Sequence, residues 1–332
     1  MPLFWWFPLL LIWSGSWAQA DELELIFYRA PKPLNWTSPG VLVRGALDNM
    51  KHKVSGEDYP HSISHVNIKL QCGQEEALYR GMTSDKSNAS YAWDFFLKRI
   101  SMDVLMINVP GRFYTKKEIL HWLPRLKRKG YVRSLKIAIN PEQCARAKGY
   151  LSLYEKLRLQ KIYGGLRSDP LRGEGAGCSA FAVSFLQVLG LFPEEIDQAW
   201  RRELKISEEL ITTSSRKATI GVLGFGQGKN RPWVRSRERY VTLSFWDPEL
   251  MFKWAGDMAR SGRLPSKSEG PFISVQWDAR GQAMASGPVF PWSEKIMEWT
   301  VGYHRKNTSR LLTLREARNQ DPGRCRLFQP CY

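Results

Sequence analysis

The sequence has no long apolar run beyond its first thirteen residues, and this absence excludes a protein with several membrane spans. It has no internal repeat and no low-complexity tract, which excludes a solenoid or a polymer-like chain. Histidine and cysteine are scarce, with five residues of each. Their spacing fits no zinc site, and no H-E-x-x-H motif occurs. We therefore expect neither a metal ion nor another cofactor.

The amino-terminal segment has the pattern of a signal peptide. Residues Met1 to Trp13 are apolar and carry no charged side chain, and Ser14-Gly15-Ser16 ends the run. Ala18-Gln19-Ala20 then supplies the small residues of a cleavage site. The run is too short to span a bilayer, so we expect cleavage after Ala20 and export to the periplasm or the extracellular space. An uncleaved amino-terminal anchor is the alternative.

Acidic residues are few relative to basic ones. The 32 Asp and Glu residues face 49 Lys and Arg residues, which gives a net charge of +17. In an exported protein such a balance favours an anionic partner from the cell envelope, either lipid or a cell-wall polymer such as peptidoglycan. It is also compatible with peripheral membrane contact. Export removes nucleic acid as a partner, and solubility alone is the simplest alternative.

The five cysteines leave one thiol over if the others pair in an oxidising compartment. Cys325 and Cys331 enclose a short loop and form a natural pair. Cys72 and Cys144 each follow a predicted strand, so a second bridge between them is a reasonable hypothesis. This pairing leaves Cys178 as the free thiol.

The pattern of apolar residues predicts an α+β fold. In the segment 65–70, Val66, Ile68 and Leu70 face one side while His65, Asn67 and Lys69 face the other, as in a half-buried strand. Capping signals at Thr115 and at Asn140-Pro141 predict two helix starts. Further strands are expected at 41–47, 103–109, 135–139, 219–223, 240–245 and 272–277, and helices at 115–130, 140–159, 178–190, 193–204, 248–260 and 292–303. We divide the chain into a signal peptide (1–20), a first domain (21–205) and a C-terminal α+β region (206–332) that is either separate from or continuous with it.

Cys178 and His65 are the residues that best fit a catalytic role. Cys178 follows Gly-Glu-Gly-Ala-Gly at the start of a predicted helix, where unpaired N–H groups favour a thiolate and stabilise an oxyanion. A cysteine nucleophile needs a base, and His65 at the beginning of a strand provides one. His61 is a competing base. The alternative is that neither residue is catalytic: Cys178 would be a small buried side chain that packs the helix start, and His65 a histidine on the polar face of the strand.

The segments around these two residues resemble the permuted papain-like proteins, relatives of the NlpC/P60 peptidases and of the lecithin:retinol acyltransferase group. The resemblance rests on His65-Val-Asn-Ile-Lys-Leu, Pro141-Glu-Gln, a tyrosine at 163 and Gly177-Cys178-Ser-Ala-Phe, and covers residues 38–190. It is strongest to the Lnb-type N-terminal periplasmic domain. His65 precedes Cys178, which is the permuted order.

The resemblance implies an antiparallel sheet with packed helices, and an exported thiol hydrolase or acyltransferase. Cys178 would attack an amide or ester of a cell-envelope molecule, and His65 would act as the base. The chain departs from the family pattern, because Ser64 replaces the usual glycine before the histidine and Gly177 replaces the usual asparagine before the cysteine. The family's third catalytic residue has no clear equivalent, and Tyr79 and Arg80 are the candidates. A non-catalytic envelope-binding protein that keeps the fold is the alternative function.

Tryptophan is abundant, with fourteen residues in the chain. We interpret the tryptophans of the C-terminal part as residues of the hydrophobic core. Stacking on sugars or contact with a membrane interface is the alternative role. These tryptophans are Trp200, Trp233, Trp246, Trp254, Trp277, Trp292 and Trp299.

Overall fold

The computed structural model of the chain describes residues 21–54, 56–85, 101–211, 218–290 and 293–306. The predicted signal peptide and the predicted Cys325–Cys331 bridge lie outside these residues. Helices and strands are interspersed along the chain, and the sheets contain antiparallel and parallel pairs. The predicted α+β class is confirmed.

The elements follow one another without a repeating unit. The strands are β1 (Glu22–Tyr28), β2 (Lys53–Val54), β3 (Glu57–Asp58), β4 (His65–Gln71), β5 (Leu78–Arg80), β6 (Met82–Ser84), β7 (Val109–Phe113), β8 (Val132–Ala138), β9 (Ile162–Tyr163), β10 (Arg201–Ser207), β11 (Tyr240–Trp246), β12 (Ser266–Glu269) and β13 (Phe272–Asp278). The α-helices are α1 (Pro39–Met50), α3 (Lys116–Arg128), α4 (Pro141–Lys156), α5 (Cys178–Leu189), α6 (Glu194–Trp200), α7 (Val222–Gly226), α8 (Pro248–Ser261) and α9 (Glu294–Lys306).

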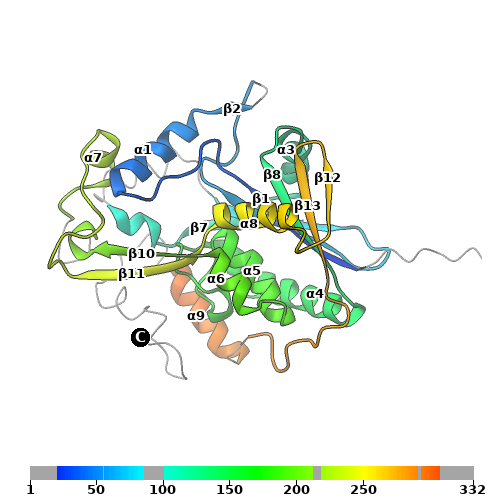
Figure 1. Cartoon of the computed structure of the whole chain (residues 1–332). Helices are drawn as coiled ribbons and strands as arrows, with labels where there is room; N and C mark the ends of the chain where they lie inside the picture. Colours follow the sequence, from blue (N-terminus) through cyan, green and yellow to red (C-terminus); the bar gives the residue numbers. More distant parts are fainter. Residues whose placement is uncertain (1–20, 55, 86–100, 212–217, 291–292, 307–332) are drawn as a thin grey trace, which may run out of the picture.

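The largest sheet has the strand order β12-β13-β8-β1-β4-β5 (Figure 1). β1 lies inside it and pairs antiparallel with both β4 and β8. β13 pairs parallel with β8, so a strand from the C-terminal region belongs to the same sheet as strands from the first region.

The two faces of this sheet are covered by different helices. Leu23, Leu25 and Phe27 of β1 share the main hydrophobic core with side chains of α4, α5 and α8. Ile26 and Tyr28 point the other way, into a smaller core with residues of α3. The alternation predicted for β4 is confirmed, because Val66, Ile68 and Leu70 belong to the main core.

Local sequence signals set the starts of the helices next to the sheet. Thr115 and Glu118 form the predicted capping box in front of α3, and Asn140 with Gln143 forms another in front of α4. α5 begins at Cys178 and ends at Leu189, and Gly190 caps it in a left-handed backbone conformation.

Two strand predictions are wrong. The segment 41–47 lies in helix α1, because Ser38 caps the helix and Pro39 occupies its first position. The segment 219–223 is not a strand either, since α7 begins at Val222. Apolar residues of both segments pack into a second core, Leu42 and Val43 from α1 and Ile220 and Val222 from the start of α7 and the turn before it.

Two further boundaries differ from the prediction. The segment 103–109 begins as a 3-10 turn (Met102–Leu105), since the Asp103 carboxylate accepts a hydrogen bond from the Ser101 N–H, and the strand starts only at Val109. The helix expected over 193–204 ends at Trp200, because the following residues pair with β11 as strand β10.

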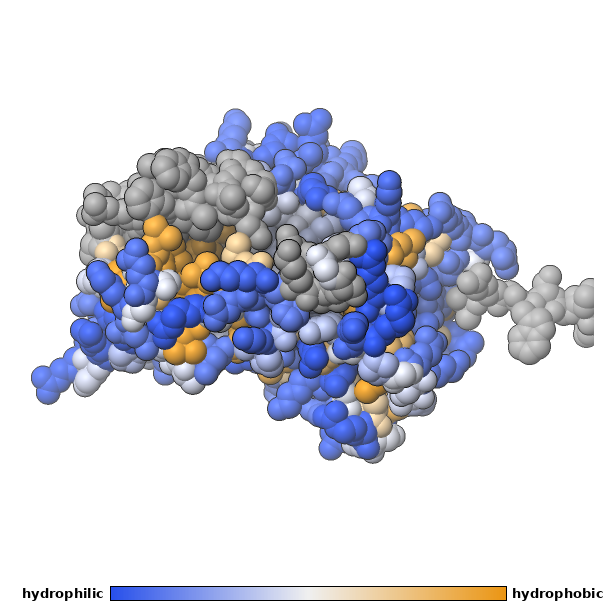
Figure 2. Space-filling model, turned by 90° about the horizontal axis from the view of Figure 1, so that it is seen from above, coloured by the Kyte–Doolittle hydropathy of each residue, from blue (hydrophilic) through white to orange (hydrophobic). Residues whose placement is uncertain are grey.

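A second packing unit lies beside the sheet. α1, α7, β10 and β11 gather at the left of Figure 1 around their own hydrophobic core. Figure 2 shows the face on the side of α1, β2 and α3, where hydrophilic side chains cover most of the surface around smaller apolar patches.

Candidate functional site

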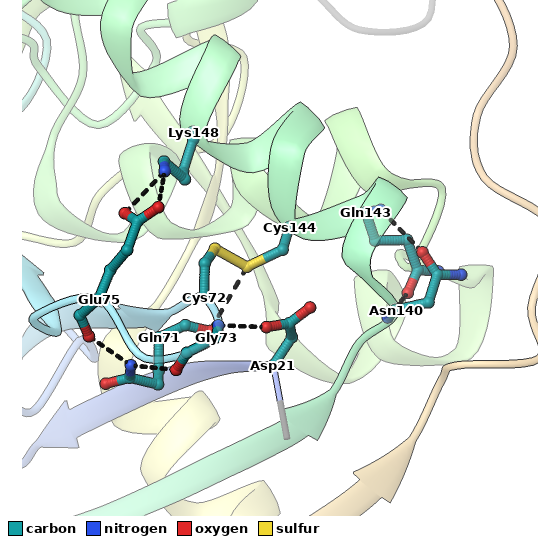
Figure 3. The surroundings of a disulfide bond; sticks show 9 residues. All are labelled: Asp21, Gln71, Cys72, Gly73, Glu75, Asn140, Gln143, Cys144 and Lys148. Carbon is teal, nitrogen blue, oxygen red and sulfur yellow. Dashed lines mark hydrogen bonds and ion pairs between the residues drawn. A yellow bond between two sulfur atoms is a disulfide. The ribbon is translucent and has the colours of Figure 1, made fainter. Parts of the chain in front are cut away.

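The predicted bridge between Cys72 and Cys144 is present, with the two Cα atoms 5.9 Å apart (Figure 3). It joins the end of β4 to α4. The turn after Cys72 is held by further contacts: the Asp21 carboxylate accepts from the Gly73 N–H at 2.6 Å, and Glu75 pairs with Lys148 at 2.7 Å. The bridge leaves Cys178 as the free cysteine among the described residues.

Cys178 is the first residue of α5 and is buried, with 5 % of its surface exposed. Gly177 at the helix cap offers no side chain to the first N–H groups of the helix. The thiol lies within hydrogen-bonding reach of the backbone of Val66 and Ser179 and of the Tyr163 hydroxyl, which all lower its pKa. Burial has the larger effect and raises the pKa of the thiol to about 11. The thiol is therefore protonated at neutral pH.

His65 opens β4 and is also buried. Its Nε2 lies 3.0 Å from Oδ1 of Asn67, two residues further along the same face of the strand. An amide oxygen only accepts hydrogen bonds, so Nε2 carries the hydrogen and Nδ1 is left as the basic nitrogen. Burial lowers the pKa of His65 to about 4, although the hydrogen bond to Asn67 acts in the opposite direction.

Among the described residues, the strand that flanks β4 at this edge of the sheet, β5, covers only part of it. β5 pairs with Ile68–Leu70 of β4 and not with the preceding residues. After β5 the chain turns away at Gly81, where an added Cβ would lie 1.7 Å from Oδ1 of Asn67. A glycine at this position is thus what allows Asn67 to reach His65. The thiol of Cys178 approaches the backbone of Val66 near this edge.

The structure brings Cys178 to the strand that carries His65, but the two side chains take different directions. Val66, beside which the thiol lies, faces the main core, whereas His65 pairs with Tyr28 on the face covered by α3. Within the described residues, no hydrogen bond joins the thiol to a His65 ring nitrogen. Tyr114 lies near both, since its ring is 5.5 Å from that of His65 and, besides burial, the charge of Cys178 contributes to raising the Tyr114 pKa.

A second histidine belongs to the same cluster. The ring of His61 stacks on that of His65, with centroids 4.3 Å apart and planes 7° from parallel. Burial and the charge of His65 both lower the pKa of His61. The lowered pKa makes His61 a weaker base than an exposed histidine, although its ring lies close enough to His65 to compete with it.

A cavity of about 250 Å³ opens beside His61, between the sheet and α3, and neither His65 nor Cys178 is among the residues that line it. Its wall includes His61 and Asn67, and aromatic and aliphatic groups supply much of the rest. These are the side chains of Tyr28, Pro60, Tyr114, Ile119 and Trp122. Such a lining suits an apolar group with a few polar contacts at one end.

The two candidates for a third catalytic residue do not approach His65. Arg80 pairs with Glu155 at 3.2 Å on the outer strand, and Tyr79 lies beside Lys116. Ser64, which replaces the family's glycine, donates a hydrogen bond to Glu249 at 2.5 Å and accepts one from the Ala30 N–H. It ties the start of β4 to α8.

Sequence reasoning kept His61 as a competing base and placed Asn67 on the face of His65, but it did not identify Asn67 or Tyr114 as contacts of the His65 ring. The alternation along β4 was the available signal for Asn67 as a partner. His61 and Tyr114 come from a loop and a strand end, so no periodicity could have placed them.

In the part of the chain that the structure describes, no cluster of His, Cys, Asp and Glu is arranged to hold a metal ion. None of the helices in those residues is long and apolar enough to cross a membrane. A scan against protein-family models finds no match, and searches of curated proteins and of solved structures find no significant similarity. Membership of the permuted papain-like family therefore stays a prediction.

Proposed function

We propose that the protein is an exported thiol hydrolase or acyltransferase of the permuted papain-like class. The observation that carries the proposal is the placement of Cys178 at the start of α5, against the backbone of the residue that follows His65. Asn67 supports it, because its hydrogen bond fixes the tautomer and orientation of His65, as the third member of a Cys-His-Asn set does.

In the proposed reaction the Cys178 sulfur attacks the carbonyl carbon of an amide or ester. The thiol proton moves to Nδ1 of His65, and the same proton then passes to the leaving amine or alcohol. A thioester forms as the bond to the leaving group breaks, and water or another acceptor cleaves the thioester and restores the thiol. The N–H groups at the start of α5 favour the oxyanion of each tetrahedral intermediate.

Both groups are neutral at pH 7, because the pKa of Cys178 is raised and that of His65 is lowered. The proton must therefore move during the attack rather than before it. The side chains also have to approach, since no hydrogen bond joins them among the described residues. Substrate entering beside Tyr114 would occupy the space between them.

The cavity beside His61 supports a substrate with an apolar acyl group more than a stem peptide of peptidoglycan. Tyr28, Tyr114 and Trp122 in its wall offer aromatic surface for an acyl chain, and the polar side chains that share the wall, Asn67, Lys117, Glu118 and His121, would meet the polar end of such a substrate. The basic charge of the chain suits an anionic envelope component.

The test is acylation by p-nitrophenyl butyrate, followed by mass mapping of the modified peptide. We expect release of one equivalent of nitrophenol in a burst, with the butyryl group on Cys178. His65→Ala should slow acylation by about 100-fold or more, the usual contribution of a general base. His304→Ala is the matched histidine control and should leave the rate unchanged.

The alternative is an envelope-binding protein that keeps the fold without catalysis. The raised pKa of the buried thiol and its lack of a hydrogen bond to His65 favour it. If Cys178 is not acylated, or is acylated as fast in His65→Ala as in the wild-type chain, the enzyme proposal is wrong and this alternative takes its place.

A further inference from the structure

Helix α9 presents two opposite faces. Met297 and Val301 are buried in the main core, and together with Thr300 they pack on Gly173, where an added Cβ would meet them at 3.3–3.4 Å. Gly173 lies in the loop that leads to Cys178. The helix, orange in Figure 1, is thus fixed to the protein by one side.

The other side of α9 carries large apolar and aromatic side chains in the open. Ile296 is 51 % exposed, Trp299 61 % and Tyr303 40 %. Their spacing of three and four residues aligns them in one stripe along the helix. The rings of Trp299 and Tyr303 stack with centroids 6.0 Å apart, which holds them as a single surface. We call these three residues the α9 stripe.

The chemistry of the α9 stripe fits a lipid surface. Tryptophan and tyrosine combine an apolar ring with a polar group and are enriched at membrane interfaces, and isoleucine adds aliphatic surface. Basic residues adjoin the stripe at both ends, with Lys295 next to Ile296 and Arg305 and Lys306 after Tyr303, and they outnumber the helix's two acidic residues, Glu294 and Glu298. The basic charges, within a chain of net charge +17, complement anionic headgroups. A second copy of the chain would bring equally basic ends with it, which makes self-association through this face less favourable.

We propose that α9 is a peripheral membrane-binding helix that inserts Ile296, Trp299 and Tyr303 into the interface of an anionic phospholipid bilayer. This contact needs no catalytic step and goes beyond the proposed hydrolase. Since the buried side of α9 packs on the loop before Cys178, the contact would also hold that end of α5 near the lipid.

The experiment is co-sedimentation of the full chain with vesicles of phosphatidylglycerol and phosphatidylcholine, compared with vesicles of phosphatidylcholine alone. We expect binding to the anionic vesicles, weakened by salt. The double variant Ile296→Ser with Trp299→Ser should lower the partition coefficient by about 100-fold, about tenfold for each apolar side chain. Residues 1–20 carry no charged side chain, so their contribution is the same for every variant and does not select anionic lipid.

The matched control is Leu223→Ser in α7, a residue 42 % exposed, which should bind like the wild-type chain. Far-UV circular dichroism should be unchanged in all variants, because the replaced side chains are exposed. Equal binding by the double variant, equal binding to both vesicle types, or no binding at all would each overturn the proposal. The proposal would also be overturned if the wild-type chain sediments as a dimer and the double variant sediments as a monomer. Cys178→Ser should bind as the wild-type chain does, so loss of catalysis and loss of lipid binding remain separable.

Discussion

Removal of the Cys72–Cys144 bridge should destabilise the protein mainly through its unfolded state. The bridge closes a loop with a sequence separation of 72 residues. A cross-link over a loop of that length lowers the entropy of the unfolded chain enough to contribute about 4 kcal/mol to the free energy of unfolding at 25 °C. The native contacts around the turn do not depend on the bridge, because Asp21 holds Gly73 and Lys148 holds Glu75. We therefore expect the double variant Cys72→Ala with Cys144→Ala to fold.

The change is best measured by urea unfolding, followed by tryptophan fluorescence and by circular dichroism on the same samples. Coincident transitions are needed before the midpoints are converted to free energies. Alanine is preferred to serine because position 144 is 98 % buried and a hydroxyl there would lack a partner. The variant should also have a larger m-value, since its unfolded chain is less compact.

Cys178→Ala is the control, because it removes a buried sulfur without opening a loop. Its m-value should equal that of the wild-type chain. A loss below about 1 kcal/mol in the double variant, with unchanged m-value, would refute the entropic reasoning. It would mean that the chain between Cys72 and Cys144 is already restricted when the protein is unfolded.

Two further predictions concern β4. Because burial holds the pKa of His65 at about 4 in the folded protein against 6.5 in the unfolded chain, the unfolded chain takes up a proton that the folded one refuses. The stability that the neutral His65 contributes is present above pH 6.5 and is lost as the pH falls towards 4, which lowers the free energy of unfolding by about 3 kcal/mol. Urea unfolding at pH 7 and at pH 4 measures this loss. The variant His65→Asn should lose correspondingly less stability between these pH values than the wild-type chain does. Gly81→Ala should displace Asn67 and slow acylation of Cys178 about as much as Asn67→Ala does, because the new Cβ would lie 1.7 Å from Oδ1 of Asn67. Gly149→Ala, which meets no atom within 4 Å, should leave the rate unchanged, and equal rates in the two glycine variants would contradict this role of Gly81.

Sequence patterns predicted the elements that carry strong local signals. The capping residues Thr115 and Asn140 set the starts of α3 and α4, and the glycines on either side of α5 set its ends. The alternation in β4 was predicted correctly. The pairing of Cys72 with Cys144 was also predicted correctly, because each cysteine follows the end of a predicted strand. These signals act within a few residues, which is why a single sequence reveals them.

Other elements depend on tertiary contacts. β1 was missed although Glu22-Leu-Glu-Leu25 alternates, because the strand is buried on both faces and its second half, Ile26-Phe-Tyr28, is continuously apolar. Residues 41–47 are rich in valine and leucine and suit a strand, but the cap at Ser38 and the second core select a helix. At the candidate site, Tyr114 reaches His65 from a distant part of the chain, and such a contact leaves no local trace, whereas His61 lies close in sequence and was already a competing base.

The position of β13 has a consequence for how the protein assembles. Ile273 of β13 is the parallel partner of Arg133, and Glu22 of β1 is the partner of Ala138, so neighbouring strands come from widely separated segments. Chains in which distant segments must meet fold slowly, because loops have to close before the contacts form. A chain still emerging from the ribosome or a translocation channel would expose β8 as a sheet edge until residue 278 has appeared. During that interval the unpaired edge of β8 can pair with a strand of another chain, and it is the segment to which a chaperone would bind.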